Sequence, residues 1–140
     1  MYPLDSVEIR DAIERAWNDS AGDDPLNRHE EGGYIVRNGD GSLGVERWPK
    51  GAGAFIVPSP RAADGTYNGK VVLGEFHTHP NPQVDENGKT WLEGPSPGDL
   101  FGIQDEKYPG DSYIIGHNNV YVVSKDGVPS VLGAKADVLK

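Results

Sequence analysis

Two histidines separated by a single residue, His77 and His79, are the side chains in this sequence best suited to bind a metal ion. Side chains alternate between the two faces of a strand, so histidines at positions i and i+2 point to the same face. A carboxylate from another element would complete a set of three ligands, and Asp99 is the best candidate. Three protein ligands and one open position are typical of catalytic rather than structural zinc. Two imidazoles and a carboxylate also suit iron or manganese.

The stretch around the third candidate ligand has a second interpretation. Ser96, Pro97 and Asp99 are spaced as the N-cap, first and third residues of a helix. Helix capping alone explains these residue types without any metal. The two interpretations are compatible, because an aspartate in the first turn can direct its carboxylate outward to a metal while Ser96 lies beside it.

Three sequence segments together resemble one family, the JAMM metallopeptidases, also called MPN-plus domains. HTHP at 77–80 and SPGD at 96–99 resemble the family's H-x-H-P and S-x-x-D motifs, and EEGGYIV at 30–36 resembles its upstream glutamate strand. The resemblance covers residues 30–99, with one departure: residues 81–95 are longer than the family's usual spacing. Loop closure entropy grows slowly with loop length. The insertion therefore affects the expected shape of the substrate groove more than the metal site.

The resemblance implies a zinc-dependent peptidase or isopeptidase, with Zn²⁺ bound by His77, His79 and Asp99. It further implies that Ser96 helps to bind the oxyanion of the tetrahedral intermediate and that an upstream glutamate is the general base. In the family this glutamate stands three residues before a glycine, which selects Glu30. Glu31 is the alternative, and only one of the two adjacent residues can face the metal. Both could also be solvated charges at a strand end.

Family members cleave peptide bonds, or isopeptide bonds that join ubiquitin-like proteins to lysine. We therefore expect a protein or peptide substrate, which includes ubiquitin-like conjugates. The segments EEGGYIV and RNGDGS are most similar to the bacterial toxin-associated branch of the family. Two alternatives remain: a catalytically idle scaffold that binds proteins, and a metal-dependent toxin hydrolase, such as a nuclease, with another substrate.

Composition narrows the possible partners. The 140 residues predict one domain, 1–140, and the 13 basic and 22 acidic residues give a net charge of −9, which argues against a nucleic-acid partner. The absence of cysteine excludes disulfides and thiolate metal sites. No apolar run approaches the ~20 residues of a membrane span, and the acidic N-terminus lacks the features of a signal peptide. We expect a soluble protein, cytoplasmic or delivered to the cytoplasm of a target cell.

Hydrophobic periodicity predicts the elements that position these residues. A helix is expected over Asp5–Asn18, with Asp5 and Glu8 as a capping box. A second helix is expected to begin at Ser96. Strands are expected over Glu30–Val36, Ser42–Trp48, Lys70–His79, Tyr113–Ile115, Val120–Val123 and Ser130–Leu132. This order predicts an α+β or mixed α/β domain with a central, mostly antiparallel sheet flanked by helices, the layout that the JAMM resemblance implies.

The motifs do not assign a role to several other residues near them. Glu75 shares the strand face of the two histidines, and it either orients a ligand or lies near the sheet end. His29 and His117 are expected at the surface. Trp91 and Leu92 interrupt the polar insertion, and they form either a flap over the substrate or a hydrophobic pin that packs on the domain.

Overall fold

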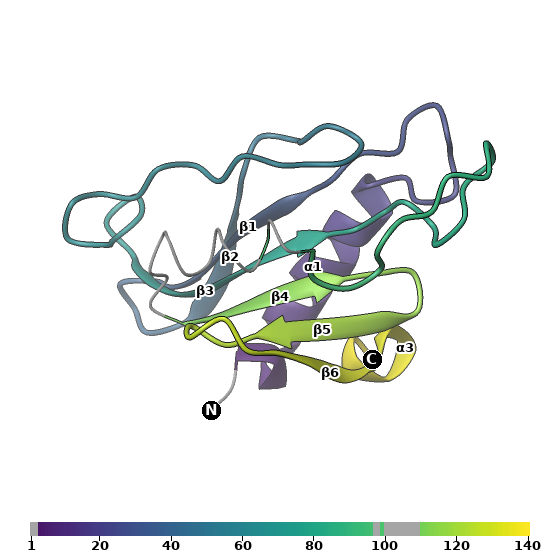
Figure 1. Cartoon of the computed structure of the whole chain (residues 1–140). Coiled ribbons are helices and arrows are strands. Elements are labelled where there is room, and N and C mark those ends of the chain that lie inside the picture. The colour runs from purple at the N-terminus through teal and green to yellow at the C-terminus, as the bar shows by residue number, and fades with distance from the viewer. Residues whose placement is uncertain (1–2, 97–98, 100–109) are drawn as a thin grey trace.

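The computed structural model describes residues 3–96, 99 and 110–140. In this part of the chain, a 3-10 turn and one long helix precede the strands, and a short helix follows them (Figure 1). The elements are η1 (Pro3–Asp5), α1 (Val7–Asp19), β1 (Gly32–Arg37), β2 (Leu43–Arg47), β3 (Val71–Thr78), β4 (Asp111–Ile115), β5 (Asn119–Val123), β6 (Pro129–Ala134) and α3 (Lys135–Val138). The chain is thus a small α+β protein with one mixed sheet.

The six strands lie in the order β2-β1-β3-β4-β5-β6. All neighbours are antiparallel except β3 and β4, which are parallel. Parallel strands need a long crossover connection. The chain therefore leaves β3 after Thr78 and returns at Asp111, and this connection contains His79, Ser96 and Asp99.

The predicted strands match the observed ones within a few residues at each end. The apolar run at 54–57 lies outside the strands, and α3 was not predicted. Of the helix expected to begin at Ser96, most residues lie outside the part of the chain that the structure describes. Among the described helices, none is long and apolar enough to cross a membrane.

The start of α1 corrects the predicted cap. Asp5 belongs to η1, and Ser6 is the N-cap, with its side chain accepting a hydrogen bond from the Ile9 amide at 3.5 Å. The reason is local: the Ser6 amide donates to the Pro3 carbonyl, so the 3-10 turn closes before the helix can begin. Ile9 and Ile13, four residues apart on one face of α1, are fully buried.

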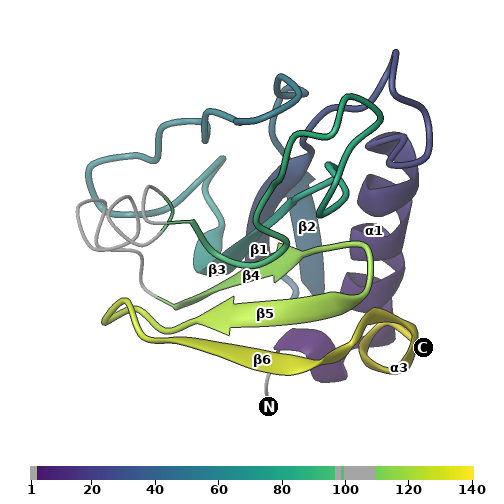
Figure 2. The same ribbon diagram turned by 45° about the vertical axis from the view of Figure 1, so that its right-hand side comes forward.

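The two faces of the sheet are covered differently. On one face, α1 packs over a cluster that includes Ile35 and Phe76. On the other face, a second cluster includes Trp48, Ile56 and Tyr67, all from the chain that connects β2 to β3 (Figure 2). Among the described residues, irregular chain rather than a helix covers this second face. The second helix expected to flank the sheet falls mainly on residues outside the described part of the chain.

Candidate metal centre

The side chains of β3 alternate as its sequence predicts. Phe76 packs in the cluster under α1, and the Thr78 hydroxyl lies 2.6 Å from that of Ser20, which follows the helix. Glu75, His77 and His79 line a cavity on the opposite face. The two histidines therefore share the face that α1 leaves uncovered.

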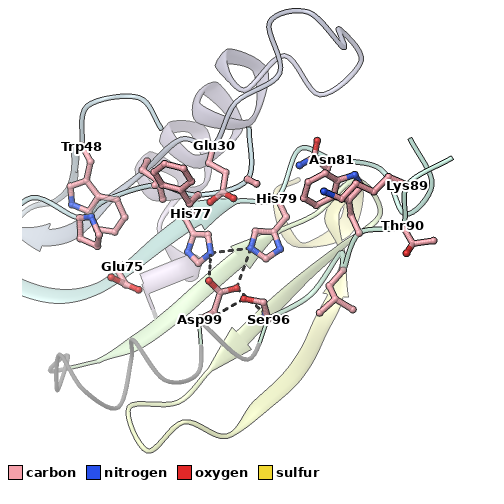
Figure 3. A pocket seen from close by; sticks show the side chains of 16 residues that line it. Glu30, Trp48, Glu75, His77, His79, Asn81, Lys89, Thr90, Ser96 and Asp99 are labelled. Atoms are coloured by element: carbon pink, nitrogen blue, oxygen red, sulfur yellow. Dashed lines mark hydrogen bonds and ion pairs between the residues drawn. The ribbon is translucent and has the colours of Figure 1, made fainter. Parts of the chain in front are cut away.

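Three candidate ligand side chains converge at the end of β3 (Figure 3). The Nε2 atoms of His77 and His79 lie 3.1 Å apart. Asp99 completes the group, with Oδ1 at 3.4 Å from His77 Nε2 and Oδ2 at 3.2 Å from His79 Nε2. Ligand bonds of 2.0–2.1 Å at a tetrahedral angle separate the ligand atoms by about 3.3 Å. The donor set and its spacing thus fit a tetrahedral zinc ion.

Hydrogen bonding and charge favour a cation between these atoms. His79 Nδ1 lies 3.1 Å from the Glu93 carbonyl, which can only accept, so this nitrogen carries a hydrogen, and Nε2 faces Asp99. Burial lowers the pKa of His77, but the hydrogen bond and charge of Asp99 outweigh it and raise this pKa to about 9. Burial raises the pKa of Asp99, yet the two histidines hold it well below its usual range. A shared proton or a metal ion supplies the positive charge that the cluster needs.

Ser96 and Asp99 make the reciprocal hydrogen bonds of a capping box. The Ser96 amide donates to Asp99 Oδ2 at 2.9 Å, and the Asp99 amide donates to Ser96 Oγ at 3.1 Å. The same carboxylate faces both histidines. One side chain therefore makes the capping hydrogen bond and lies against both candidate ligands, so the two interpretations remain compatible. Since Ser96 Oγ accepts from the amide, its hydroxyl hydrogen remains for another acceptor in the cavity that it lines.

Glu30 and Glu31 point to opposite faces. Glu31 forms ion pairs with His29 and with Arg47, whose guanidinium lies 2.6 Å from Oε1. Glu30 lines the cavity, and its carboxylate lies within 4.8 Å of a ligand nitrogen on each of the two metal-site histidines. The backbone of Glu30 is fixed by two hydrogen bonds to residues 51 and 52.

Either Glu30 or Asp99 could supply the carboxylate ligand, because Glu30 also forms a compact group with the two histidines. The distances favour Asp99, which lies within 3.4 Å of both Nε2 atoms. Burial raises the pKa of Glu30, an effect that the charges of His77 and His79 partly offset. Asp99 is therefore the closer of the two candidate carboxylates, and Glu30 is a buried carboxylate beside the histidines.

The cavity has a volume of about 720 Å³, and its lining combines apolar side chains with the polar side chains of Asn81, Lys89 and Thr90. Phe55 and Leu92 line it although they are 63% and 61% exposed. Trp48 forms part of the wall. Its ring occupies the space above Gly32, where an added Cβ would lie 2.8 Å from it. No periodicity in the sequence marks Trp48 or Phe55 as cavity residues, because they come from irregular chain.

The Asn81–Pro95 insertion closes on itself around Asp85. Its carboxylate accepts hydrogen bonds from the Asn87 and Lys89 amides and from Trp91 Nε1. The loop is also tied to the domain, since Asn81 Nδ2 donates to the Gly53 carbonyl at 2.7 Å. Trp91 is half-buried, lines the cavity, and belongs to neither core cluster of the described residues.

Three predicted peripheral residues have defined partners. Glu75 Oε1 accepts a hydrogen bond from the Ser112 hydroxyl at 2.8 Å, which places this carboxylate between the sheet and the cavity. His117 Nε2 lies 2.6 Å from the Pro80 carbonyl, and its ring meets the edge of Trp17. His29 pairs with Glu31. Both histidines are half-buried and hydrogen-bonded.

No family model, curated protein or solved structure matches this chain. The functional assignment therefore depends on the sequence motifs and on the geometry of the site.

Proposed function

We propose that this protein is a zinc-dependent peptidase or isopeptidase of the JAMM type. The observation that carries the proposal is the convergence of His77 Nε2, His79 Nε2 and the Asp99 carboxylate at separations of 3.1–3.4 Å. A buried glutamate beside such a group is the usual requirement for metal-assisted hydrolysis.

The chain's own residues would divide the reaction among them. His77, His79 and Asp99 would hold the zinc, which when bound polarises a carbonyl and acidifies a water molecule. Glu30 would accept the proton of the attacking water and deliver it to the leaving amine. Ser96 would donate its hydroxyl hydrogen to the oxygen on which negative charge develops. No covalent intermediate is needed, which agrees with a chain that has no cysteine.

The form of the cavity supports a peptide chain as the substrate. Two irregular segments form its apolar walls, one containing Phe55 and Ile56 and the other Trp91 and Leu92. Apolar walls beside a few polar catalytic groups suit side chains that flank a scissile bond. The net charge of −9 disfavours a phosphate backbone.

Metal content and cleavage activity test this proposal together. Zinc in the purified protein is measured by elemental analysis, and the protein is incubated with linear peptides, lysine-linked isopeptides, DNA and RNA. We expect about one zinc per chain and cleavage of peptide or isopeptide bonds that a chelator abolishes and added Zn²⁺ restores. Stoichiometric zinc with no cleavage of any substrate would support a catalytically idle scaffold that binds proteins. Cleavage of nucleic acid alone would support a metal-dependent nuclease.

A further inference from the structure

Glu93 is a buried carboxylate outside the predicted site. It is 7% exposed and accepts hydrogen bonds from four groups on the turn between β4 and β5 and on β5 itself. The donors are the Asn118 amide at 2.5 Å, the Asn119 amide and Nδ2 at 3.3 Å each, and the Tyr121 hydroxyl at 2.7 Å. Burying a charge is costly unless several donors compensate it. The turn therefore forms a specific hydrogen-bonding site for the Glu93 carboxylate.

Gly116 leaves the space that the Glu93 side chain occupies. A Cβ at this position would lie 2.2 Å from Cγ of Glu93, so any larger residue would displace the carboxylate stem. The next residue, His117, contacts the Pro80 carbonyl. The same turn thus holds the chain directly after His79 and, through Glu93, the far end of the insertion.

The main chain of Glu93 contacts the candidate ligand. Its carbonyl accepts the Nδ1–H of His79 at 3.1 Å, while its side chain is anchored in the turn. Glu93 therefore connects the turn between β4 and β5 to the His79 imidazole. Partners of this kind fix the tautomer and orientation of a ligating histidine.

We propose that Glu93 is a positioning residue for His79. Its anchored side chain holds its carbonyl where it keeps His79 in the Nδ1–H tautomer, with Nε2 directed at His77 and Asp99. The role of zinc in this inference rests on the proposed function, whereas the tautomer does not.

The tautomer of His79 tests the proposal directly. Two-bond ¹H–¹⁵N correlation spectra of the metal-free protein identify which ring nitrogen of each histidine carries the hydrogen. We expect Nδ1 of His79 to carry a hydrogen in every molecule of the wild type, and only in a fraction of the molecules of Glu93→Ala. Competition with a chromophoric chelator should show Zn²⁺ binding about 10- to 100-fold weaker in Glu93→Ala, as for other partners of ligating histidines. Glu93→Gln, which keeps an acceptor oxygen, should give an intermediate result.

Glu86→Ala is the matched control. Glu86 ties the same insertion to the domain through Arg28, at 2.7 Å, rather than through His79. This variant should keep the wild-type tautomer and zinc affinity. A wild-type result in Glu93→Ala, or the same change in Glu86→Ala, overturns the proposal.

Two further outcomes are informative. If Glu93→Ala does not fold, Glu93→Gln and Tyr121→Phe each remove part of the anchor and should each weaken zinc binding severalfold; wild-type affinity in both would contradict the inference. If the wild type binds no zinc while Glu93→Ala still alters the His79 tautomer, the positioning role stands and the proposed function fails.

Discussion

Glu30 and His79 face each other across the end of the β1–β3 ladder, on the face of the sheet that α1 leaves uncovered. The Thr78 amide donates to the Glu31 carbonyl at 2.8 Å, which extends the pairing beyond the last strand residues. In the antiparallel register, Gly32 pairs with His77, so Glu30 comes opposite His79. Strand pairing thus brings the candidate base and a candidate ligand together.

Replacing Glu30 with glutamine should abolish turnover without removing zinc. The amide cannot accept the proton of the attacking water, and the loss of kcat is expected to be about 100-fold or more. Glu31→Gln is the matched control, because Glu31 pairs with His29 and Arg47 on the other face. The control should keep its activity and lose at most a little stability. If Glu31→Gln is the inactive variant, the assignment of the base is wrong by one residue.

Zinc content should separate the ligands from the base. His79→Ala and Asp99→Asn should each reduce bound zinc to near zero in elemental analysis, whereas Glu30→Gln should stay near one zinc per chain. His77, His79 and Asp99 belong to neither core cluster of the described residues, so circular dichroism should show that the zinc-free variants remain folded. Stoichiometric zinc in His79→Ala would eliminate this site.

Trp91→Ala tests whether the insertion contacts the substrate. The Trp91 indole donates to Asp85 at 3.0 Å and lies under the Lys89 ammonium, so both partners are within its own loop. We expect unchanged zinc content and Tm, and a KM for a protein substrate raised about tenfold, equivalent to about 1.4 kcal/mol of lost binding. Short peptides that do not reach the loop should be cleaved as before.

Leu26→Ala is the control for this experiment, because Leu26 is 93% exposed and does not line the cavity. A Tm lowered by several degrees in Trp91→Ala, with KM unaltered, would identify the tryptophan as a structural pin.

Lys135 predicts a dependence of stability on alkaline pH. Its ammonium lies 3.4 Å from the centroid of the Trp17 ring, and burial lowers its pKa to about 8. An unfolded lysine has a pKa of about 10.4, so between these values the unfolded chain binds more protons and stability rises with pH. The Tm of the wild type minus that of Lys135→Met should therefore increase from about pH 7.5 to pH 10. A decrease would show that attraction to the ring outweighs burial.

Local sequence patterns predict the features that residues close together in the chain determine, such as the strands and the faces to which their side chains point. Alternation along β3 places His77 on the correct face, and the same parity separates Glu30 from Glu31. The predicted N-cap of α1 is wrong by one residue, because Asp5 is the last residue of η1 and the helix begins after Ser6.

Contacts between distant segments could not be predicted in this way. Glu93 lies in a polar loop where an acidic residue is expected to be solvated, and only the fold brings Asn118 and Tyr121 to it. Trp48 ends a predicted strand with no sign that it forms a cavity wall. Such roles depend on how irregular chain packs over a sheet, and irregular chain has no period.

The parallel pairing of β3 with β4 has a consequence for proteolysis. Because the crossover begins at His79, and Asp99 lies within it, a metal ion bound to both would cross-link a segment of the connection. A cross-link across about 20 residues reduces the entropy of the open chain by the equivalent of about 3 kcal/mol. Bound zinc would therefore restrain residues 79–99. The rate at which a protease cleaves this segment would then report metal occupancy without any knowledge of the substrate.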